Sequence, residues 1–310
     1  MAWDYYINET GQRAIAERLG VSNATVSRLL KRARQRGVVQ VSIHSPWGLS
    51  VGLEQALRER FGLAWAQVVP NWLVRRSVPE ALGQAAAFYL NGEIGAIRRL
   101  AVGWGRTIAQ MGPYAAGQSH GEVVEMVGTF AASTEHLKSL RLSTSLAHAY
   151  GMEAVVLSAP AVAEDAEACR RLTAHPQIHD VLERARHAEM AIASLGPASD
   201  SSTLVGLGLV TPWEMRDLRR SGAVGEILGR FFDATGAPVD SALDARLVGL
   251  GLEDLRRMPR TMVVAAGADK AEALRGALAG RLMTHLVTDE ATAEALLERS
   301  VTADAPDRNR

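Results

Sequence analysis

Residues 12–36 read QRAIAERLGVSNATVSRLLKRARQR, a pattern that predicts two short amphipathic helices joined by a tight turn. In the first helix the apolar Ala14, Ile15 and Leu19 recur at helical spacing. Gly20 follows directly, and glycine ends a helix at little cost because it adopts left-handed backbone angles. Val21 then fills the corner between the two helices. The stretch therefore predicts a helix-turn-helix.

The second helix of this unit has one apolar and one polar face. Val26, Leu29 and Leu30 share the apolar face, and Ser22 or Asn23 is placed to cap the helix start. Short polar side chains at the helix start suit base edges in a major groove, and the arginines that follow suit phosphates. We expect this helix to bind double-stranded operator DNA through Ser22, Asn23, Thr25, Val26, Arg28, Lys31 and Arg32.

Two flanking segments complete the predicted module. Residues 38–43 alternate after Gly37 as the strand of a winged helix-turn-helix does, and residues 3–7 predict the end of a first helix. Two amphipathic helices with a glycine turn also occur in many helical proteins that bind no DNA. The coincidence of helix length, turn, caps and basic charge nevertheless favours a DNA-binding domain over residues 1–48.

The charge of the chain is unevenly distributed. Residues 1–48 hold seven Lys and Arg against three Asp and Glu, which gives this part a charge of +4. The formal net charge of the whole chain is zero, so the remainder carries −4. A basic module on a mildly acidic body fits a protein that meets DNA with one face only.

Length and composition predict a second domain. A chain of 310 residues leaves roughly 250 beyond the DNA-binding module. No run of about 18 apolar residues and no signal peptide are visible, so we expect a cytoplasmic protein with no membrane partner. The single cysteine, Cys169, excludes an intramolecular disulfide and a thiolate zinc cluster. We expect neither a metal nor a cofactor.

An apolar stripe follows the predicted module. Leu49, Leu53, Leu57 and Phe61 recur every four residues and predict a linker helix over residues 49–63. The stripe fits a contact between protomers, and it fits equally a helix packed on its own body. The first alternative predicts that the stripe contributes to self-association, because a single recognition helix binds too weakly to select one genomic site.

From residue 64 to residue 310 short apolar runs alternate with helical stretches. The alternation predicts an α/β domain with a mostly parallel sheet, helices on both faces and ligands at the carboxyl ends of its strands. The predicted helices cover residues 79–90, 107–111, 136–150, 269–279 and 291–297. The predicted strands cover residues 67–69, 100–103, 122–127, 154–157, 190–193, 261–265 and 285–287.

The first of three strand ends suited to a ligand lies in AVGWGRTIAQ, residues 101–110. Gly103, Gly105 and Thr107 follow a strand and precede a helix, so their backbone N–H groups and the threonine hydroxyl suit an anion. Arg106 adds a fixed positive charge. A tight turn explains the same glycines equally well.

The other two strand ends are Gly128-Thr129 and the segment after Gly267, where Asp269 and Lys270 open a helix. Elsewhere arginine supplies most of the positive charge, so a lysine here indicates a compact ammonium beside a ligand; a surface lysine is the alternative. The predicted effector-binding residues are Gly103, Trp104, Gly105, Arg106, Thr107, Gly128, Thr129, Asp233, Asp269 and Lys270.

Taken together, these motifs resemble the SorC/DeoR-type family of sugar-responsive bacterial transcriptional regulators. The resemblance implies a body related to the sugar-phosphate isomerase fold that senses a small carbohydrate or sugar phosphate, and assembly as a homotetramer. It rests on residues 12–43, on Tyr5-Tyr6, and on VGWGRT (102–107), GAVGEILGRFFDATG (222–236), LEDLRRMPR (252–260), AAGADKAEALRGAL (265–278) and LVTDEATAEALL (286–297).

The chain departs from this family at two places. Ser194-Leu195-Gly196 stands where the family has a glycine-isoleucine-glycine run, and the segment near Leu140-Arg141 lacks the expected asparagine. Both places belong to the ligand region in the family. The family's usual effector is therefore not implied, and an unphosphorylated, polyol-like ligand stays an alternative.

Two functions from different classes compete. An isomerase-like enzyme with an appended DNA-binding module needs a carboxylate or histidine base at the sugar. The eight histidines form no cluster with metal-ligand spacing, and no His or Glu stands beside the glycine loops in the sequence. We therefore predict a DNA-binding regulator, controlled by a small sugar or sugar phosphate, with no catalytic residues.

Overall fold

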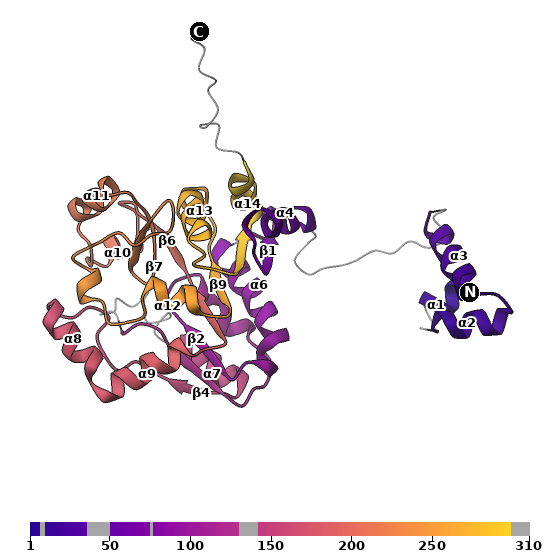
Figure 1. Ribbon diagram of the computed structural model, residues 1–310, viewed down its shortest axis with the longest axis horizontal. Helices are drawn as coiled ribbons and strands as arrows, with labels where there is room; N and C mark the ends of the chain where they lie inside the picture. The colour runs from indigo at the N-terminus through magenta and orange to yellow at the C-terminus, as the bar shows by residue number, and fades with distance from the viewer. Residues whose placement is uncertain (7–9, 36–49, 75–76, 130–141, 299–310) are drawn as a thin grey trace, which may run out of the picture. The chain divides into compact units, whose positions relative to one another are not determined.

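The computed structural model describes residues 1–6, 10–35, 50–74, 77–129 and 142–298. The chain divides into two compact units, Met1–Pro46 and Trp47–Arg310 (Figure 1), and each is described by itself. The predicted wing strand at residues 38–43 and the predicted start of the linker helix at Leu49 lie outside the described residues.

The N-terminal unit consists of three helices, α1 (Ala2–Tyr6), α2 (Gln12–Leu19) and α3 (Asn23–Gln35). Gly20 ends α2 with left-handed backbone angles, φ 65° and ψ 31°, as its position predicts. The buried side chains of Ile15, Ala16, Val26 and Leu30 form a small core between α2 and α3. The predicted helix-turn-helix is therefore confirmed in its helices and in its turn.

The body of the second unit is a seven-stranded sheet in which every neighbouring pair is parallel. The strand order is β1-β10-β9-β5-β2-β3-β4. All seven predicted strands are present, each within about two residues of its predicted bounds. They are β1 (Trp65–Val69), β2 (Arg99–Val102), β3 (Glu122–Glu125), β4 (Glu153–Val155), β5 (Met190–Ala193), β9 (Thr261–Val264) and β10 (His285–Asp289).

Successive residues of the central strands enter two different cores. Leu100 and Val102 of β2 belong to one core, and Ala101 between them belongs to the other. Side chains alternate between the two faces of a strand, so each core covers one face of the sheet. Burial on both faces explains why these strands read as continuous apolar runs.

Helices cover both faces of this sheet (Figure 1). The segment predicted as a helix over residues 107–111 is a 3-10 helix, η2 (Ile108–Tyr114), and a second 3-10 turn, η5 (Ala268–Lys270), precedes α13. The other helices are α4 (Val51–Phe61), α5 (Asn71–Val74), α6 (Val78–Glu93), α7 (Leu142–Tyr150), α8 (Ala166–Ala174), α9 (Pro176–Arg186), α10 (Thr203–Gly206), α11 (Pro212–Arg220), α12 (Leu252–Arg257), α13 (Ala271–Ala279) and α14 (Glu290–Leu297), with 3-10 turns η1 (Ile94–Ala96) and η4 (Asp244–Arg246).

A small antiparallel sheet, which the sequence pattern did not predict, joins β6 (Leu195–Pro197), β7 (Ala223–Ile227) and β8 (Arg230–Asp233). The β7–β8 hairpin turns at Leu228 and Gly229, which both have positive φ angles of 57° and 81°. Two such residues match the twist of a hairpin.

The apolar stripe of the linker helix packs on its own body. Leu57 on α4 is fully buried, and Leu53 and Phe61 are partly buried against the same core. Leu57 is therefore used within one protomer, whereas Leu53 and Phe61 keep some exposed surface, so their contribution to self-association stays a prediction.

Candidate functional site

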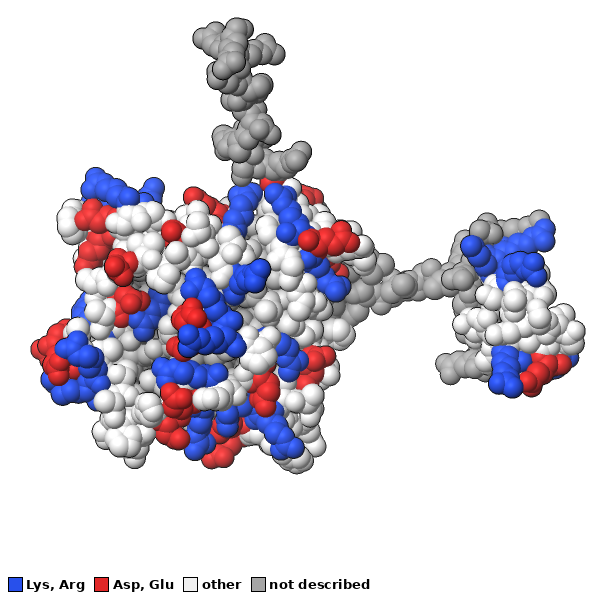
Figure 2. All heavy atoms as spheres, viewed as in Figure 1, with Lys and Arg blue, Asp and Glu red and all other residues white. Residues whose placement is uncertain are grey.

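The N-terminal unit presents its candidate DNA interface on α3. Arg28, Lys31 and Arg32 are exposed along this helix, and Figure 2 shows a cluster of basic side chains on the unit. Ser22 caps the helix, since its Oγ accepts a hydrogen bond from the Thr25 N–H at 3.1 Å and lies 2.9 Å from the Thr25 hydroxyl. The exposed charges suit phosphates and base edges.

Val26 does not belong to this interface. Its side chain is fully buried in the core of the N-terminal unit, so its prediction as a DNA contact is wrong. Leu29, which the periodicity places on the apolar face, is 40% exposed. The buried stripe of α3 is therefore narrower than the sequence pattern predicts.

The candidate effector site is a cavity of about 110 Å³ at the carboxyl ends of β2, β5 and β9, three neighbouring strands of the parallel sheet. The small antiparallel sheet closes it from another direction. Ligands bind in such crevices beyond the carboxyl ends of parallel strands. The cavity is lined by Trp104, Gly105, Arg106, Thr107, Ser194, Leu195, Gly196, Pro197, Ser201, Ser202, Thr203, Glu226, Leu228, Asp269 and Lys270.

Glycines shape this cavity where other chain segments come close. A Cβ atom on Gly105 would lie 2.2 Å from the Ser194 Oγ, and Gly105 has φ +150°. A Cβ atom on Gly196 would lie 2.3 Å from a carboxylate oxygen of Glu226. Gly103 lies beneath the cavity, where its N–H donates to the Ile192 carbonyl at 2.8 Å. These positions exclude larger side chains.

The cavity wall holds the buried side chain of Glu226 and the half-buried side chain of Lys270. Burial raises the pKa of Glu226 to about 7, although a hydrogen bond from the Gly229 N–H and the charge of Lys270 both lower it. Burial lowers the pKa of Lys270, and the charge of Arg106 lowers it further, whereas Asp269 and Glu226 raise it. A charged and a titratable group thus face one small space.

Six of the ten predicted effector residues line this cavity, namely Trp104, Gly105, Arg106, Thr107, Asp269 and Lys270. The Gly128 N–H donates to the Val248 carbonyl, and Thr129 pairs with the backbone of Ala159 and Ala161. These residues hold two loops together, and neither lines the cavity.

Asp233 is likewise placed elsewhere. Its Oδ1 accepts hydrogen bonds from the Thr235 N–H and hydroxyl and from the Ala237 N–H, at 2.8, 2.7 and 3.0 Å. The carboxylate therefore stabilises the turn after β8, and Asp233 does not line the cavity.

The sequence pattern missed Glu226, Ser194 and the hydroxyls of Ser201, Ser202 and Thr203. Glu226 stands in the 222–236 segment that carries part of the family resemblance, but only the hairpin brings it beside the glycine loop. In three dimensions a Glu does lie beside the glycine loop, and the prediction that none does is wrong. Ser194 was identified only as a departure from the family.

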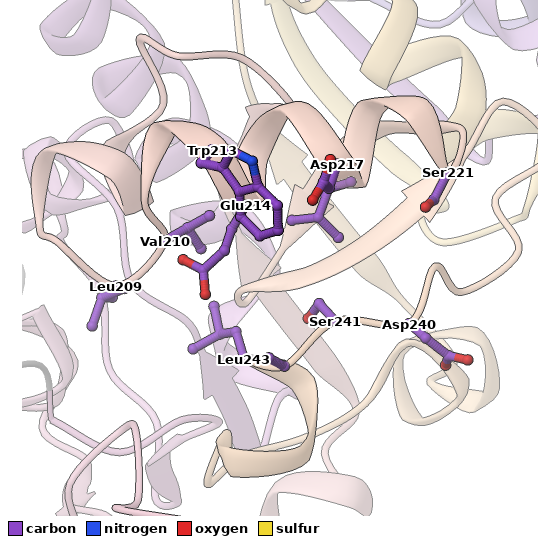
Figure 3. A pocket seen from close by; sticks show the side chains of 11 residues that line it. Leu209, Val210, Trp213, Glu214, Asp217, Ser221, Asp240, Ser241 and Leu243 are labelled. Carbon is purple, nitrogen blue, oxygen red and sulfur yellow. The ribbon is translucent and has the colours of Figure 1, made fainter.

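A second hollow, of about 160 Å³, lies between α11 and the segment after β8 (Figure 3). Trp213 is 63% exposed at its rim. Its polar groups already serve the fold, since Glu214 forms a capping box with Thr211 and Asp217 pairs with Arg220 at 3.0 Å.

The described residues include no group of three or more His, Cys, Asp or Glu side chains that could hold a metal ion. Within the described ranges, no helix has the length and apolar character to cross a bilayer.

Comparison with known proteins gives a family description for each part of the chain. The family description "Putative sugar-binding domain" matches residues 45–298, and "Winged helix-turn-helix DNA-binding" matches residues 9–40. The chain is 32% identical over 303 residues to the uncharacterized transcriptional regulator YjhU of Escherichia coli (strain K12), covering 95% of this chain and 92% of YjhU. It is 32% identical over 299 residues to the deoxyribonucleoside regulator of Bacillus subtilis (strain 168), covering 94% of each.

Solved structures give the same result. The full-length sorbitol operon regulator SorC from Klebsiella pneumoniae superposes with a TM-score of 0.74 at 25% identity, over 96% of each chain. A DeoR family transcriptional regulator from Listeria monocytogenes gives 0.72 at 28% identity, over 80% of this chain and 99% of that one. The chain therefore belongs to the SorC/DeoR-type family of DNA-binding transcriptional regulators.

Proposed function

We propose that this regulator is controlled by a small sugar or sugar phosphate bound in the cavity between the glycine loop, β7 and η5. The observation that carries the proposal is the pair of cations, Arg106 and Lys270, in a small space that also holds hydroxyls and a buried carboxyl group. The cations attract an anionic group such as a phosphate. Glu226 and the Ser and Thr hydroxyls are suited to hydrogen bonds with sugar hydroxyls.

Binding rather than conversion of the sugar is the role we infer. Glu226, with its pKa raised to about 7, has the character of a general base, which favours the isomerase alternative. The relatives are named regulators, however. A protonated Glu226 also has a use without chemistry, because its O–H donates to a ligand hydroxyl. Incubation of the parent with an aldose phosphate, followed by NMR, should show no ketose.

The remaining parts of the proposal concern assembly and place of action. We infer a cytoplasmic homotetramer that binds a palindromic or repeated operator, since several recognition helices acting together give the affinity that one lacks. Arg28, Lys31, Arg32, Asn23 and the polar side chains at the start of α3 are the proposed DNA contacts.

A thermal-shift screen of sugar phosphates and polyols identifies the effector, because a ligand that binds only the folded state raises the melting temperature. Lys270→Met then tests the site by calorimetry. The variant should lose binding of the sugar phosphate that the parent binds, while its DNA affinity without ligand stays unchanged. Arg98→Met, on an exposed arginine outside the cavity, is the matched control. Equal affinity of Lys270→Met and parent for that compound contradicts the proposed anion site.

Coupling between the two sites is measured separately. If the effector prefers one arrangement of the protein, a typical coupling free energy of about 1–3 kcal/mol changes DNA affinity roughly 5- to 150-fold. Fluorescence anisotropy of operator DNA with and without the ligand measures this ratio directly. A ligand that binds without changing DNA affinity contradicts the regulatory role.

A further inference from the structure

The first turn of α14 is hydrogen-bonded to three segments that are far apart in the sequence. The Thr292 Oγ1 accepts from the Gly267 N–H at 2.8 Å. The Glu290 carboxylate accepts from the Ser50 hydroxyl through one oxygen and from the Asn71 N–H through the other, each at 2.9 Å. One helix turn therefore holds the starts of η5, α4 and α5.

Gly267 begins the turn that carries the cavity lysine. The Lys270 N–H donates to the Gly267 carbonyl at 2.9 Å, which closes this turn. Gly267 has φ +126°, and a Cβ atom there would lie 2.5 Å from the Asp269 Oδ1. The position therefore favours glycine, and one hydrogen bond ties the backbone of Lys270 to that of Gly267.

Ser50 and Asn71 connect the same helix turn to α4. Ser50 stands directly before α4, and its side chain does not cap that helix but reaches Glu290 instead. A second carboxylate anchors α4, since Glu54 accepts from the Val68 N–H at 3.0 Å. In the sequence, α4 is the first described helix after α3.

The helix between these contacts is firmly packed. Thr292, Ala293 and Leu296 are fully buried, and the Asp289 carboxylate caps the helix by accepting from the Thr292 N–H at 2.9 Å. α14 contacts both α4 and η5. Because Glu290 and Thr292 lie on one turn of a packed helix, they move together.

We propose that Thr292 and Glu290 link the effector cavity to α4, so that a change in the turn around Lys270 alters the hold of α14 on Ser50 and Asn71. This proposal rests on the effector role of the cavity. Thr292 and Glu290 are then positioning residues that line no part of the cavity. Hydrogen bonds, and not proximity alone, connect the turn of Lys270 to the start of α4.

Hydrogen–deuterium exchange of the full chain, without effector, tests the link. Thr292→Val removes the hydroxyl at constant shape and should speed amide exchange roughly fivefold in the peptide with Gly267 and also in the peptide with Asn71. Glu290→Gln replaces one of the two accepting oxygens by an NH2 group, so the side chain cannot accept from both Ser50 and Asn71. Amide exchange should then be faster in the peptide with Asn71 and also in the peptide with Gly267. The matched controls are Thr288→Val, a buried hydroxyl without a partner among the described residues, and Glu294→Gln, an exposed residue of the same helix.

The outcomes separate clearly. The link is supported if amide exchange is faster at Asn71 in Thr292→Val and at Gly267 in Glu290→Gln. Exchange of β5, and exchange in the two control variants, should stay as in the parent. Faster exchange confined to the peptide of the lost hydrogen bond overturns it. If β5 also exchanges faster in Thr292→Val, the conservative Thr292→Ser should restore the exchange of the parent, and failure to restore it overturns the link as well. Since no effector is added, a failure of the proposed function appears only in the Lys270→Met calorimetry.

Discussion

Glu226 and Lys270 face the same small cavity, and each charge stabilises the other while burial disfavours both. The positive charge of Lys270 lowers the pKa of Glu226, and the negative charge of Glu226 raises that of Lys270. In both side chains burial is the larger effect and shifts the pKa the opposite way. Glu226, whose pKa is raised to about 7, is therefore poised to change its protonation when a ligand replaces water.

The first prediction concerns pH and stability. Glu226 has an ordinary pKa of 4.5, and burial raises it to about 7 in the folded protein. Its protonated form therefore favours folding: this contribution is complete below about pH 4.5 and is lost as the pH rises through about 7. Between pH 5 and 8 we expect the parent to lose about 2–3 kcal/mol of unfolding free energy that Glu226→Gln retains. Urea denaturation across this pH range measures the difference, with the exposed Glu294→Gln as control. If the unfolding free energies of Glu226→Gln and of the parent change equally with pH, Glu226 is not the group with the raised pKa.

The second prediction concerns the wall of the cavity at Gly105. Alanine at this position meets the Ser194 Oγ at 2.2 Å and must adopt φ +150°. We expect Gly105→Ala to destabilise the fold by about 1–3 kcal/mol. Gly52→Ala is the control, since Gly52 lies within α4 with open space around it, and this change should be neutral or stabilising. Similar denaturation midpoints for both variants would show that the two loops are not in contact.

The third prediction follows from the packing of α4 on its own body. Leu57 is fully buried within one protomer, so Leu57→Ala should reduce the unfolding free energy by about 2–5 kcal/mol. The mass of the folded oligomer should stay unchanged by light scattering. Val51→Ala, on the exposed side of the same helix, should alter stability little. A smaller oligomer with unchanged protomer stability would return the apolar stripe to an interface between protomers.

The parallel sheet was predictable because its strands are buried on both faces. A strand such as β5, with Met190 to Ala193 all buried, reads as a short continuous apolar run, and helices follow in the intervals. The antiparallel sheet gave no such signal. A single residue, Ser194, separates β5 from β6, which starts at Leu195, and β7 contains Gly225 and Glu226.

This difference decided which site residues were found. Arg106 and Lys270 follow predicted strands, and the topology of a parallel sheet brings such strand ends together. Glu226 lies on the unpredicted hairpin, and the sequence pattern points instead to Asp233 of the same segment. Sequence spacing alone does not show which of two carboxyl groups on a hairpin turns toward the cavity and which stabilises a turn.

The fourth prediction concerns DNA binding by α3. If Arg28 contacts a base edge, Arg28→Ala should cost roughly 1–3 kcal/mol on the preferred site and relax specificity at one position. Arg32→Ala should weaken binding evenly across sequences and reduce the salt dependence, as expected for a phosphate contact. Arg98→Ala, on an exposed arginine of the body, should change neither. Fluorescence anisotropy on selected DNA measures all three, and unchanged affinity in both α3 variants contradicts the assignment of α3 as the recognition helix.

The last prediction uses a buried hydroxyl to separate stability from binding. Within the described part of the chain, the Ser194 Oγ is buried in the cavity wall without a hydrogen-bond partner. An unpaired buried hydroxyl disfavours folding, so Ser194→Ala should leave the unfolding free energy unchanged or raise it by up to about 1 kcal/mol. If the Ser194 hydroxyl binds the ligand, Ser194→Ala should weaken ligand binding. The bound sugar then loses a hydrogen bond of about 1 kcal/mol, which lowers the affinity roughly fivefold. Thr288→Val is the matched control, since Thr288 Oγ1 is also buried and unpaired among the described residues but lies outside the cavity lining; it should match Ser194→Ala in denaturation and the parent in calorimetry with the sugar phosphate from the screen. Equal ligand affinity for Ser194→Ala and Thr288→Val would show that the serine hydroxyl does not meet the effector.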